Sequence, residues 1–532
     1  MPNLSQPTQR LISRYQQWYQ FLQPKEGMPF IHVDEVASKV AAFYEKIRTV
    51  VDWKEEHLMR RVAIIRKLKR KFLDLELFNF SNKKEIAESL VLELIRGGHF
   101  PNDKIEETRI ADVQLTLNKY IFIFKNAPPA KSGREKLQFY NWLLEIAACE
   151  IEQVLYPFAK ERALIDYMFE LMKERIGSNL PEGEKNIQIY VAVQQALFKL
   201  DRPIISYNLL KYKYPLWNSP TKEWLFEVSK NIYKIWDNIE RDLFHPLGKK
   251  FYTVCEKYDT PYLLLGDILS EENPAEVSKK ISEPEVLENL TKKVYHKRLS
   301  TLKSRLFRAA FYSTLSILLG NSVALIVLEI PLAKLITGRF SLITIIVDIL
   351  GPTFLMFLLM VTIKTPPKSN LEIVVMETMK IVYQRKKVDF YEIKMPKKRN
   401  LLTRFIITLI YILGAVVSLG AVVLIFELVG FPPTSVIINI IFVALICFAG
   451  LVVRKRAEEL TVEEKPSGLL GFIFDILFLP VANIGRWLSN KWKKYNAIAA
   501  FFNALIDMPF LTFVEFLEQW RFFLKEKKEE IH

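Results

Sequence analysis

The chain has 532 residues, half of them hydrophobic, and carries a formal net charge of +15 at pH 7. Its 18 glycines are few for an enzyme built on Gly-rich loops, and its three cysteines, Cys149, Cys255 and Cys447, are too far apart for a disulfide framework or a zinc site. No P-loop, GxSxG, HExxH or GxGxxG pattern occurs, so we expect no enzyme activity and no cofactor.

Residues 1–306 are predicted to form a basic, all-helical cytoplasmic domain. Apolar residues recur there every three or four positions, as on the buried face of a helix. The predicted helices cover residues 36–72, 83–96, 106–124 and 135–176, the last with a kink or break at Pro157. Two helical hairpins are expected between residues 187 and 258, where proline-containing turns occur. No segment alternates as strands do, so the expected fold class is all-α.

The second half of the first predicted helix is densely basic. Its cations are Arg60, Arg61, Arg66, Lys67, Arg70 and Lys71. Such a surface can bind anionic lipid headgroups or nucleic acid, and the alternative is a solvated face of a helix packed on the core. Nucleic acid is disfavoured because no aromatic platform or RNA-binding motif accompanies the charge. The nearby acids Glu150 and Glu152 lack the Glu-x-x-His pairs of helical metal sites, so no metal ion is predicted.

Four long apolar runs follow this domain. They cover residues 309–332, 341–363, 405–428 and 435–453. Each approaches or exceeds the ~20 residues that a helix needs to cross a ~30 Å hydrocarbon core, so residues 307–456 are predicted to form a four-helix transmembrane region. In the third run, Gly414, Ser418 and Ala421 form a small-xxx-small pattern, which favours close packing between helices.

Basic residues are concentrated on one side of the predicted spans. The loop at residues 364–400 has ten Lys and Arg residues against four Asp and Glu, and Arg454, Lys455 and Arg456 follow the fourth span. By the positive-inside rule, both termini, the large domain and this loop face the cytoplasm. The polar first residues predict no cleavable signal peptide, so the internal spans direct insertion into the inner membrane.

Few polar side chains interrupt the apolar runs. The candidates are Asp348, Asn321, Ser322, Glu329 and Glu427. Glu329 and Glu427 fall at the outer interface, whereas Asp348 lies deeper, where an acid is costly and often functional. Asp348 either takes part in transport or proton coupling, or forms a structural hydrogen bond between the first two spans. Its expected partners are Asn321, Ser322 or a lysine of the short outer loop.

Residues 457–532 are predicted to form amphipathic helices at the membrane interface. The apolar stretch at 469–479 is too short to span, and Pro480 is expected to end it. The aromatic and basic residues that follow are typical of membrane interfaces; the anchors are Trp487, Trp492, Lys493 and Lys494. A hairpin of two further spans within residues 469–524 is the alternative.

Four stretches of the sequence carry a resemblance to a known family. They are DWKEEHLMRR at 52–61, LELIRGGHFPND at 92–103, RAAFY at 308–312 and LEIP at 328–331. They resemble an uncharacterised family of large multi-pass membrane proteins from Patescibacteria-like bacteria of the candidate phyla radiation. The resemblance covers most of residues 35–370. It implies the membrane architecture and a bacterial inner membrane, and it supplies no activity and no site residue.

Two hypotheses of function follow from these features. The favoured one is a non-enzymatic, membrane-anchored scaffold or recruitment protein, whose cytoplasmic domain binds an unknown protein partner and whose cytoplasmic face contacts anionic lipid headgroups. The alternative is a subunit of a transporter or channel, which would act as a homo-oligomer because four spans enclose little space. A membrane enzyme acting on lipid is the third and weakest reading, since no catalytic motif supports it.

Overall fold

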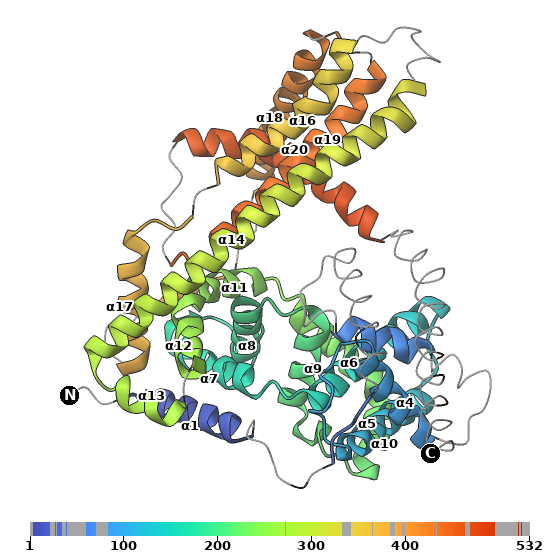
Figure 1. Cartoon of the computed structure of the whole chain (residues 1–532), viewed down its shortest axis with the longest axis vertical. Helices are drawn as coiled ribbons and strands as arrows, with labels where there is room; N and C mark the ends of the chain where they lie inside the picture. Colours follow the sequence, from blue (N-terminus) through green and yellow to red (C-terminus); the bar gives the residue numbers. More distant parts are fainter. Residues whose placement is uncertain are drawn as a thin grey trace, which may run out of the picture.

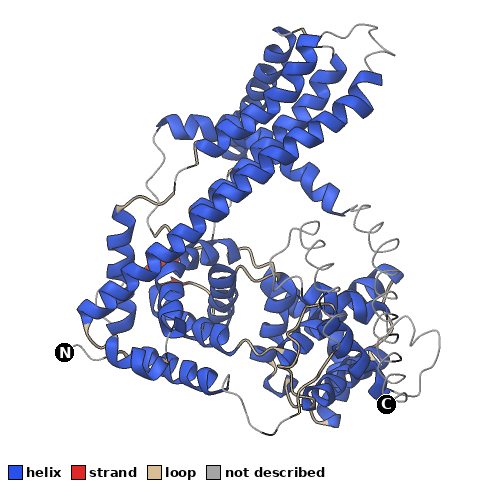
Figure 2. Cartoon of the chain, viewed as in Figure 1, coloured by secondary structure: helices blue, strands red, loops and turns tan. Residues whose placement is uncertain are grey.

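The computed structural model describes seventeen stretches or single positions of the chain. They are residues 4–21, 27, 29–33, 39, 60–70, 83–271, 273–331, 342–363, 365–383, 389–395, 400–428, 430–431, 433–462, 469–494, 516, 520 and 523. Throughout these residues the protein is predominantly helical, as the sequence predicts (Figure 2). Two parts are evident in Figure 1: a helical body, made mainly of the first 300 residues, and an apolar bundle at the far end of α14.

The helical body contains the helices that precede the apolar runs. They are α1 (Gln6–Phe21), α4 (Lys83–Arg96), α5 (Thr108–Asn126), α6 (Gly133–Leu155), α7 (Ala159–Arg175), α8 (Glu182–Phe198), α9 (Arg202–Lys213), the 3-10 turn η1 (Pro215–Trp217), α10 (Lys222–Leu243), α11 (Gly248–Lys257), α12 (Asp259–Glu271) and α13 (Pro274–Lys280). Residues 60–70 are also helical, and the rest of the predicted 36–72 helix lies almost entirely outside the described residues. Pro157 falls between α6 and α7, so the break predicted there is confirmed.

Local sequence sets several of these helix ends. The Ser132 hydroxyl accepts a hydrogen bond from the Glu135 N–H at 3.1 Å, and the Thr221 hydroxyl accepts one from the Trp224 N–H at 3.3 Å, which caps α6 and α10. Inside the body, the Glu150 carboxylate of α6 accepts hydrogen bonds from Lys119 and Tyr120 of α5 at 2.5 and 2.7 Å. These bonds satisfy polar groups that the packed helices bury.

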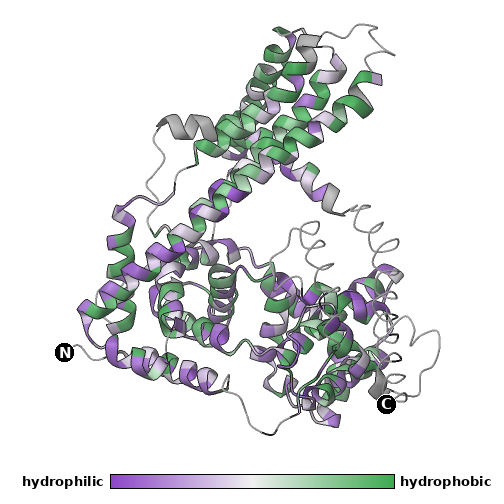
Figure 3. Cartoon of the chain, viewed as in Figure 1, coloured by the Kyte–Doolittle hydropathy of each residue, from purple (hydrophilic) through white to green (hydrophobic). Residues whose placement is uncertain are grey.

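The apolar bundle contains the helices that follow. They are the outer part of α14 (Pro284–Ala324) with its π-helical extension η2 (Leu325–Glu329), α16 (Leu342–Val361), α18 (Leu401–Leu428), α19 (Pro433–Ala457) and α20 (Leu469–Lys494). In the described chain, three helices are long and apolar enough to cross a membrane, namely Pro284–Val327, Leu401–Leu428 and Ser435–Ala457, and Ile346–Val361 is a shorter apolar helix. Only 6% of the most apolar window of α18 is buried, so its hydrophobic side chains face outward, as lipid-facing side chains do (Figure 3).

The 364–400 region differs from the expected loop. It contains α17 (Ser369–Tyr383) and β2 (Tyr391–Ile393), and β2 pairs in parallel with β1 (Ile176–Ser178) of the helical body. Val374, Ile381 and Val382 of α17 are buried in the same core as α7 and α12, and Leu460 and Val462 join that core after α19. The helical body is therefore completed by residues that follow the second and fourth apolar runs.

The C-terminal helix also differs from its prediction. Pro480 does not end it, and α20 runs from Leu469 to Lys494 and packs against α18 and α19 (Figure 1). Pro480 has no N–H for the Ile476 carbonyl, which lies 2.9 Å from where a Cβ on Gly414 would stand. The Ser418 hydroxyl donates to the Leu477 carbonyl at 2.6 Å. Gly414 and Ser418 thus allow the close helix packing predicted for this face.

Candidate functional site

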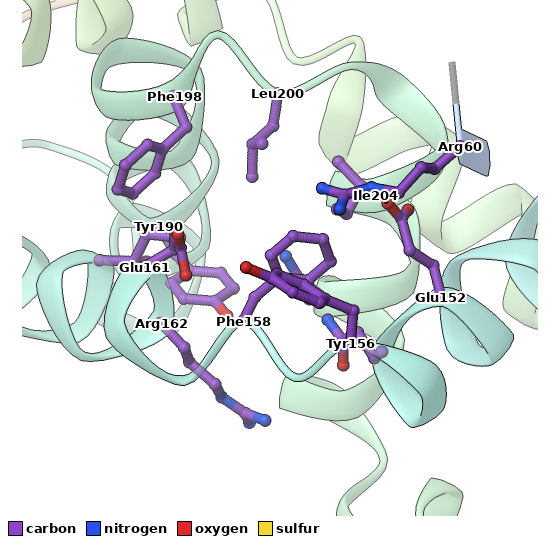
Figure 4. A pocket seen from close by; sticks show the side chains of 13 residues that line it. Arg60, Glu152, Tyr156, Phe158, Glu161, Arg162, Tyr190, Phe198, Leu200 and Ile204 are labelled. Carbon is purple, nitrogen blue, oxygen red and sulfur yellow. Dashed lines mark ion pairs between the residues drawn. The ribbon is translucent and has the colours of Figure 1, made fainter. Parts of the chain in front are cut away.

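A pocket of about 360 Å³ opens in the helical body among α6, α7, α8 and α9 (Figure 4). Aromatic and aliphatic side chains make most of its wall; the aromatic ones are Tyr156, Phe158, Tyr190 and Phe198. Three of the lining residues lie in the short connections between helices, because Tyr156 and Phe158 fall between α6 and α7, and Leu200 falls between α8 and α9. The wall of the pocket is therefore formed partly by helix ends and the connections between them.

The charged residues of this pocket lie in two places: Arg60 and Glu152 at one side, and Glu161 and Arg162 at the other (Figure 4). The Arg60 guanidinium lies 4.8 Å from the Tyr156 ring centre and forms an ion pair with Glu152 at 3.4 Å. Burial raises the pKa of Glu152 to about 7 although Arg61 and Arg60 lower it, and burial also raises the pKa of Glu161. Glu152 is 1% exposed, so desolvation of its carboxylate explains the direction of the shift.

Positive charge lies beneath and at the edge of the pocket. Arg162 is exposed at the edge and forms no ion pair with any described residue (Figure 4). The buried Lys211 ammonium donates to the side-chain oxygen of Gln153, a lining residue, at 2.6 Å. Burial, and then the charge of Arg162, lower the pKa of Lys211 to about 7. A negative group bound near Arg162 would favour the charged form of Lys211.

Asn370 joins three passages of the chain where the body meets the apolar bundle. Its Nδ2 donates to the Tyr295 hydroxyl oxygen at 3.0 Å and to the Leu460 carbonyl at 2.6 Å, and its Oδ1 accepts from the Val462 N–H at 2.9 Å. Tyr295 belongs to α14, Asn370 to α17, and Leu460 follows α19. One buried amide therefore links the cytoplasmic ends expected for three of the predicted spans.

Helix α17 is also tied directly to the N-terminal part of the chain. The buried Arg175 of α7 pairs with Glu377 at 3.1 Å. The Tyr167 hydroxyl donates to the Ile381 carbonyl at 3.0 Å, and the Thr8 hydroxyl donates to the Val382 carbonyl at 3.1 Å. These bonds satisfy carbonyls at the end of α17 that have no partner within the helix. Helices α1 and α17 consequently lie on the same side of any membrane that the bundle crosses.

A second polar site lies inside the apolar bundle around Asp348. Asn321 of α14 donates its Nδ2 to the Asp348 carbonyl, and Asn439 of α19 donates its Nδ2 to the Asp348 carboxylate. Asn439 also donates to the Ser435 carbonyl at 3.1 Å. All four side chains are at most 1% exposed. Of the predicted partners, Asn321 therefore contacts Asp348, and the outer-loop lysine lies outside the described residues.

The other polar candidates of the spans lie apart from this cluster. The Ser322 hydroxyl donates to the Leu318 carbonyl of its own helix at 2.8 Å. Glu427 is exposed near the end of α18. Glu329 belongs to η2, and its side chain is outside the described set.

Most of the predicted basic surface is engaged in ion pairs. Arg61 and Lys67 are buried, and they pair with Asp201 and Glu93 respectively. Arg70 also pairs with Glu93, at 2.8 Å. Arg61 and Lys67 therefore belong neither to a solvated face nor to an exposed surface that could bind headgroups or nucleic acid. Arg66 lies on the same helix with a partner of its own, and Lys71 is outside the described residues.

The predicted interface anchors lie on the last turns of α20. Trp487 is exposed, and the Lys491 ammonium lies 5.9 Å from its ring centre. Trp492, Lys493 and Lys494 complete the helix, and their side chains are outside the described part of the chain.

Comparison with known proteins gives no relative from which a function could be transferred. No family model, curated protein or solved structure matches the chain. Among the described residues, no group of three or more His, Cys, Asp and Glu side chains is placed to hold a metal ion.

Sequence reasoning missed Ser435, Asn439 and the pocket. Ser435 and Asn439 are four residues apart in an apolar run, so they share one helix face, and this signal could have found them. The pocket gave no comparable signal, because its lining comes from five separate segments that only the tertiary packing brings together.

Proposed function

We propose that this protein is a membrane-anchored recruitment protein that binds an acidic, apolar segment of a partner protein in the pocket among α6, α7, α8 and α9. The lining of the pocket is the observation that carries the proposal. Binding sites are usually cavities of ~300–1,000 Å³ with mainly apolar walls and a few polar groups. This pocket, at about 360 Å³, has four aromatic rings beside two arginines and two glutamates.

The charges in the pocket favour an acidic partner. Arg162 is exposed without an ion pair in the described chain, and Lys211 lies behind Gln153. Arg60, by contrast, is already paired with Glu152. A carboxylate near Arg162 would gain from the charge of Arg162 and would favour the charged form of Lys211. An apolar side chain of the same segment would fill the space between the rings.

The attachment of the body fits recruitment at a membrane surface. If the body were flexibly tethered to the bundle, one connecting segment would suffice. Instead, the body core contains residues of three segments that lead to the bundle, namely α14, α17 and residues 460–462. We propose that four helices of the bundle span a bacterial inner membrane with both termini in the cytoplasm, and that Trp487 and its neighbours contact anionic headgroups. The bound partner would then be held at a fixed height and orientation above the membrane.

Site-specific photo-cross-linking in living cells tests the proposal. A photoreactive phenylalanine at position 156 is expected to cross-link one protein, and the same group at position 226 is expected not to. Tyr156 and Phe226 are 44% and 45% exposed, so they are matched in accessibility, and only Tyr156 lines the pocket. Arg162→Glu should abolish the cross-link, while Arg241→Glu on the exposed face of α10 should preserve it. Equal cross-linking at both positions would refute the pocket as the binding site.

A second candidate is a subunit of an oligomeric transporter or channel, which the polar cluster around Asp348 favours. Polar groups inside membrane helices often mark ion pathways. Asp348→Asn keeps the size of the side chain and an oxygen that can accept the hydrogen bond from Asn439. A stably assembled Asn variant that has lost cellular function supports transport, whereas a functional one supports recruitment.

A further inference from the structure

We propose that the polar cluster of the apolar bundle is a binding site for a monovalent cation, Na⁺, with Asp348, Asn321, Asn439 and Ser435 as its oxygen ligands. This inference does not depend on the recruitment function. It concerns the opposite part of the molecule from the pocket, on helices α14, α16 and α19, which pack against one another (Figure 1).

Three buried oxygens of the cluster have no hydrogen-bond partner. They are Oδ1 of Asn321, Oδ1 of Asn439 and Oγ of Ser435, and all three side chains are 0% exposed. A buried polar atom left without a partner costs about 1–3 kcal/mol. Three such atoms lie on two neighbouring helices beside a carboxylate. They would destabilise the bundle considerably unless a ligand supplied the missing interactions.

The two amides cannot resolve this cost by rotating. The Asn321 nitrogen is committed to the Asp348 carbonyl, and the Asn439 nitrogen to the Asp348 carboxylate and the Ser435 carbonyl. Exchange of oxygen and nitrogen in either amide would place an oxygen against another oxygen. The amide oxygens therefore remain available as acceptors, and acceptors alone require a donor or a cation.

Backbone irregularities occur in two of the three helices at this level. Pro352 lies four residues after Asp348, so the Asp348 carbonyl has no helical N–H partner and takes the Asn321 amide instead. The π-helical turn η2 begins at Leu325, four residues after Asn321. Such turns are rare and frequently accompany functional sites.

The ligand types and their charge indicate which cation fits. Carboxylate, amide and hydroxyl oxygens are the ligands of hard metal ions. Asp348 is the one carboxylate among the described residues of the cluster, so a single positive charge balances it. A divalent ion would leave a net charge in an apolar environment, which is costly. A small number of oxygens on closely packed helices suits Na⁺ better than the larger K⁺.

Sodium binding to the purified full-length protein in nanodiscs tests the proposal. Radioactive Na⁺ should bind saturably, and NaCl should raise the unfolding temperature more than KCl or choline chloride at equal ionic strength. Ser435→Ala removes one small ligand and should weaken Na⁺ binding roughly tenfold or more. Ser418→Ala is the matched control, because Ser418 donates to the Gly414 and Leu477 carbonyls on the α18 side of the bundle. Its Na⁺ affinity should equal that of the wild type.

Asp348→Asn provides a second variant with nearly unchanged volume. It should assemble normally by size-exclusion chromatography and lose Na⁺ binding. Equal responses to Na⁺ and choline, or a dependence on pH alone, would overturn the proposal, since the carboxylate would then bind a proton rather than a metal ion. An equal response to K⁺ would overturn the assignment to Na⁺.

Discussion

Single buried side chains connect parts of this molecule that lie far apart in the sequence. The amide of Asn370 in α17 bonds to a hydroxyl of α14 and to two backbone groups after α19, so it joins three segments of the chain. Glu152 is buried beside Arg60 at the edge of the pocket, with a carboxyl pKa raised to about 7. Neither role follows from the sequence, because an asparagine in a basic loop and a glutamate on a helix are ordinary surface residues until their partners are known.

Asn370→Leu should lower the free energy of unfolding of the helical body by about 2–4 kcal/mol, because the Leu460 carbonyl and the Val462 N–H would stay buried without partners. Thermal unfolding of the full-length protein in detergent measures the change. Asn231→Leu is the control: Asn231 is exposed on α10 and donates only to the Glu227 carbonyl of its own helix. It should change stability by less than about 0.5 kcal/mol. Similar losses in both variants would contradict a clamp at Asn370.

Glu152→Gln should make the pH dependence of stability less steep. The raised pKa means that the folded protein holds a proton on Glu152 between pH 4.5 and about 7, where the unfolded chain has lost it. The free energy of unfolding contributed by this group therefore falls as pH rises through that window and stays low above it. The free energy of unfolding of the Gln variant, measured relative to that of the wild type, should therefore rise by about 1–2 kcal/mol between pH 5 and pH 7.5.

Chemical denaturation at several pH values measures the effect of Glu152→Gln. Ile165→Val is a suitable control, because Ile165 lines the same pocket and binds no proton. Its difference from wild type should be the same at every pH. A constant difference for Glu152→Gln as well would show that the carboxyl does not titrate in this window.

At the scale of elements, helices were predicted well where local signals are strong. The helix at 83–96 has the same bounds in the structure, since Gly97 and Gly98 follow it and disfavour its continuation. Helix α17 was missed because it is short and lies among basic residues that indicated only topology. Its apolar positions, such as Val374 and Ile381, repeat at helical spacing, but their burial depends on α7, α12 and α14, which sequence periodicity cannot place.

Residues 1–306 alone should form an incomplete body. The sequence predicts residues 1–306 as a domain of their own, yet Val374, Ile381 and Val382, which lie outside this range, are at most 3% exposed within its core. The isolated fragment should therefore unfold at a lower temperature than the full-length body and expose apolar surface. A synthetic peptide of residues 365–395 should raise its unfolding temperature.

The peptide experiment has a matched control. A peptide with Val374→Asp and Ile381→Asp keeps its length but loses the apolar face that the body buries, so it should not stabilise the fragment. Equal unfolding temperatures of the fragment with and without the wild-type peptide would contradict the role of α17 in the core.

At the scale of the whole molecule, the packing of α1 against α7 and α17 constrains the topology. Residue Glu392, half-exposed in the middle of β2, should lie on the side of the N-terminus, and Pro433, exposed at the start of α19, should lie on the opposite side. Cysteines introduced at these positions can be compared, because the native cysteines, all buried, give little background. A membrane-impermeant maleimide should label Pro433→Cys in intact cells and Glu392→Cys only after permeabilisation. Labelling of Glu392→Cys in intact cells would contradict this topology.

The core of the helical body contains residues that are synthesised late, so the body is completed only near the end of translation. The ribosome completes residues 1–306 well before α17 and residues 460–462 emerge. In the proposed four-span topology, these segments reach the body only if both helical hairpins have inserted with the correct orientation. Nascent chains halted before residue 369 should therefore remain protease-sensitive throughout the body, and those extended past residue 462 should become resistant. A chain inserted the wrong way would keep an unfilled hydrophobic groove, which quality-control proteases recognise. Under the proposed topology, completion of the helical body would therefore report that the bundle has inserted correctly.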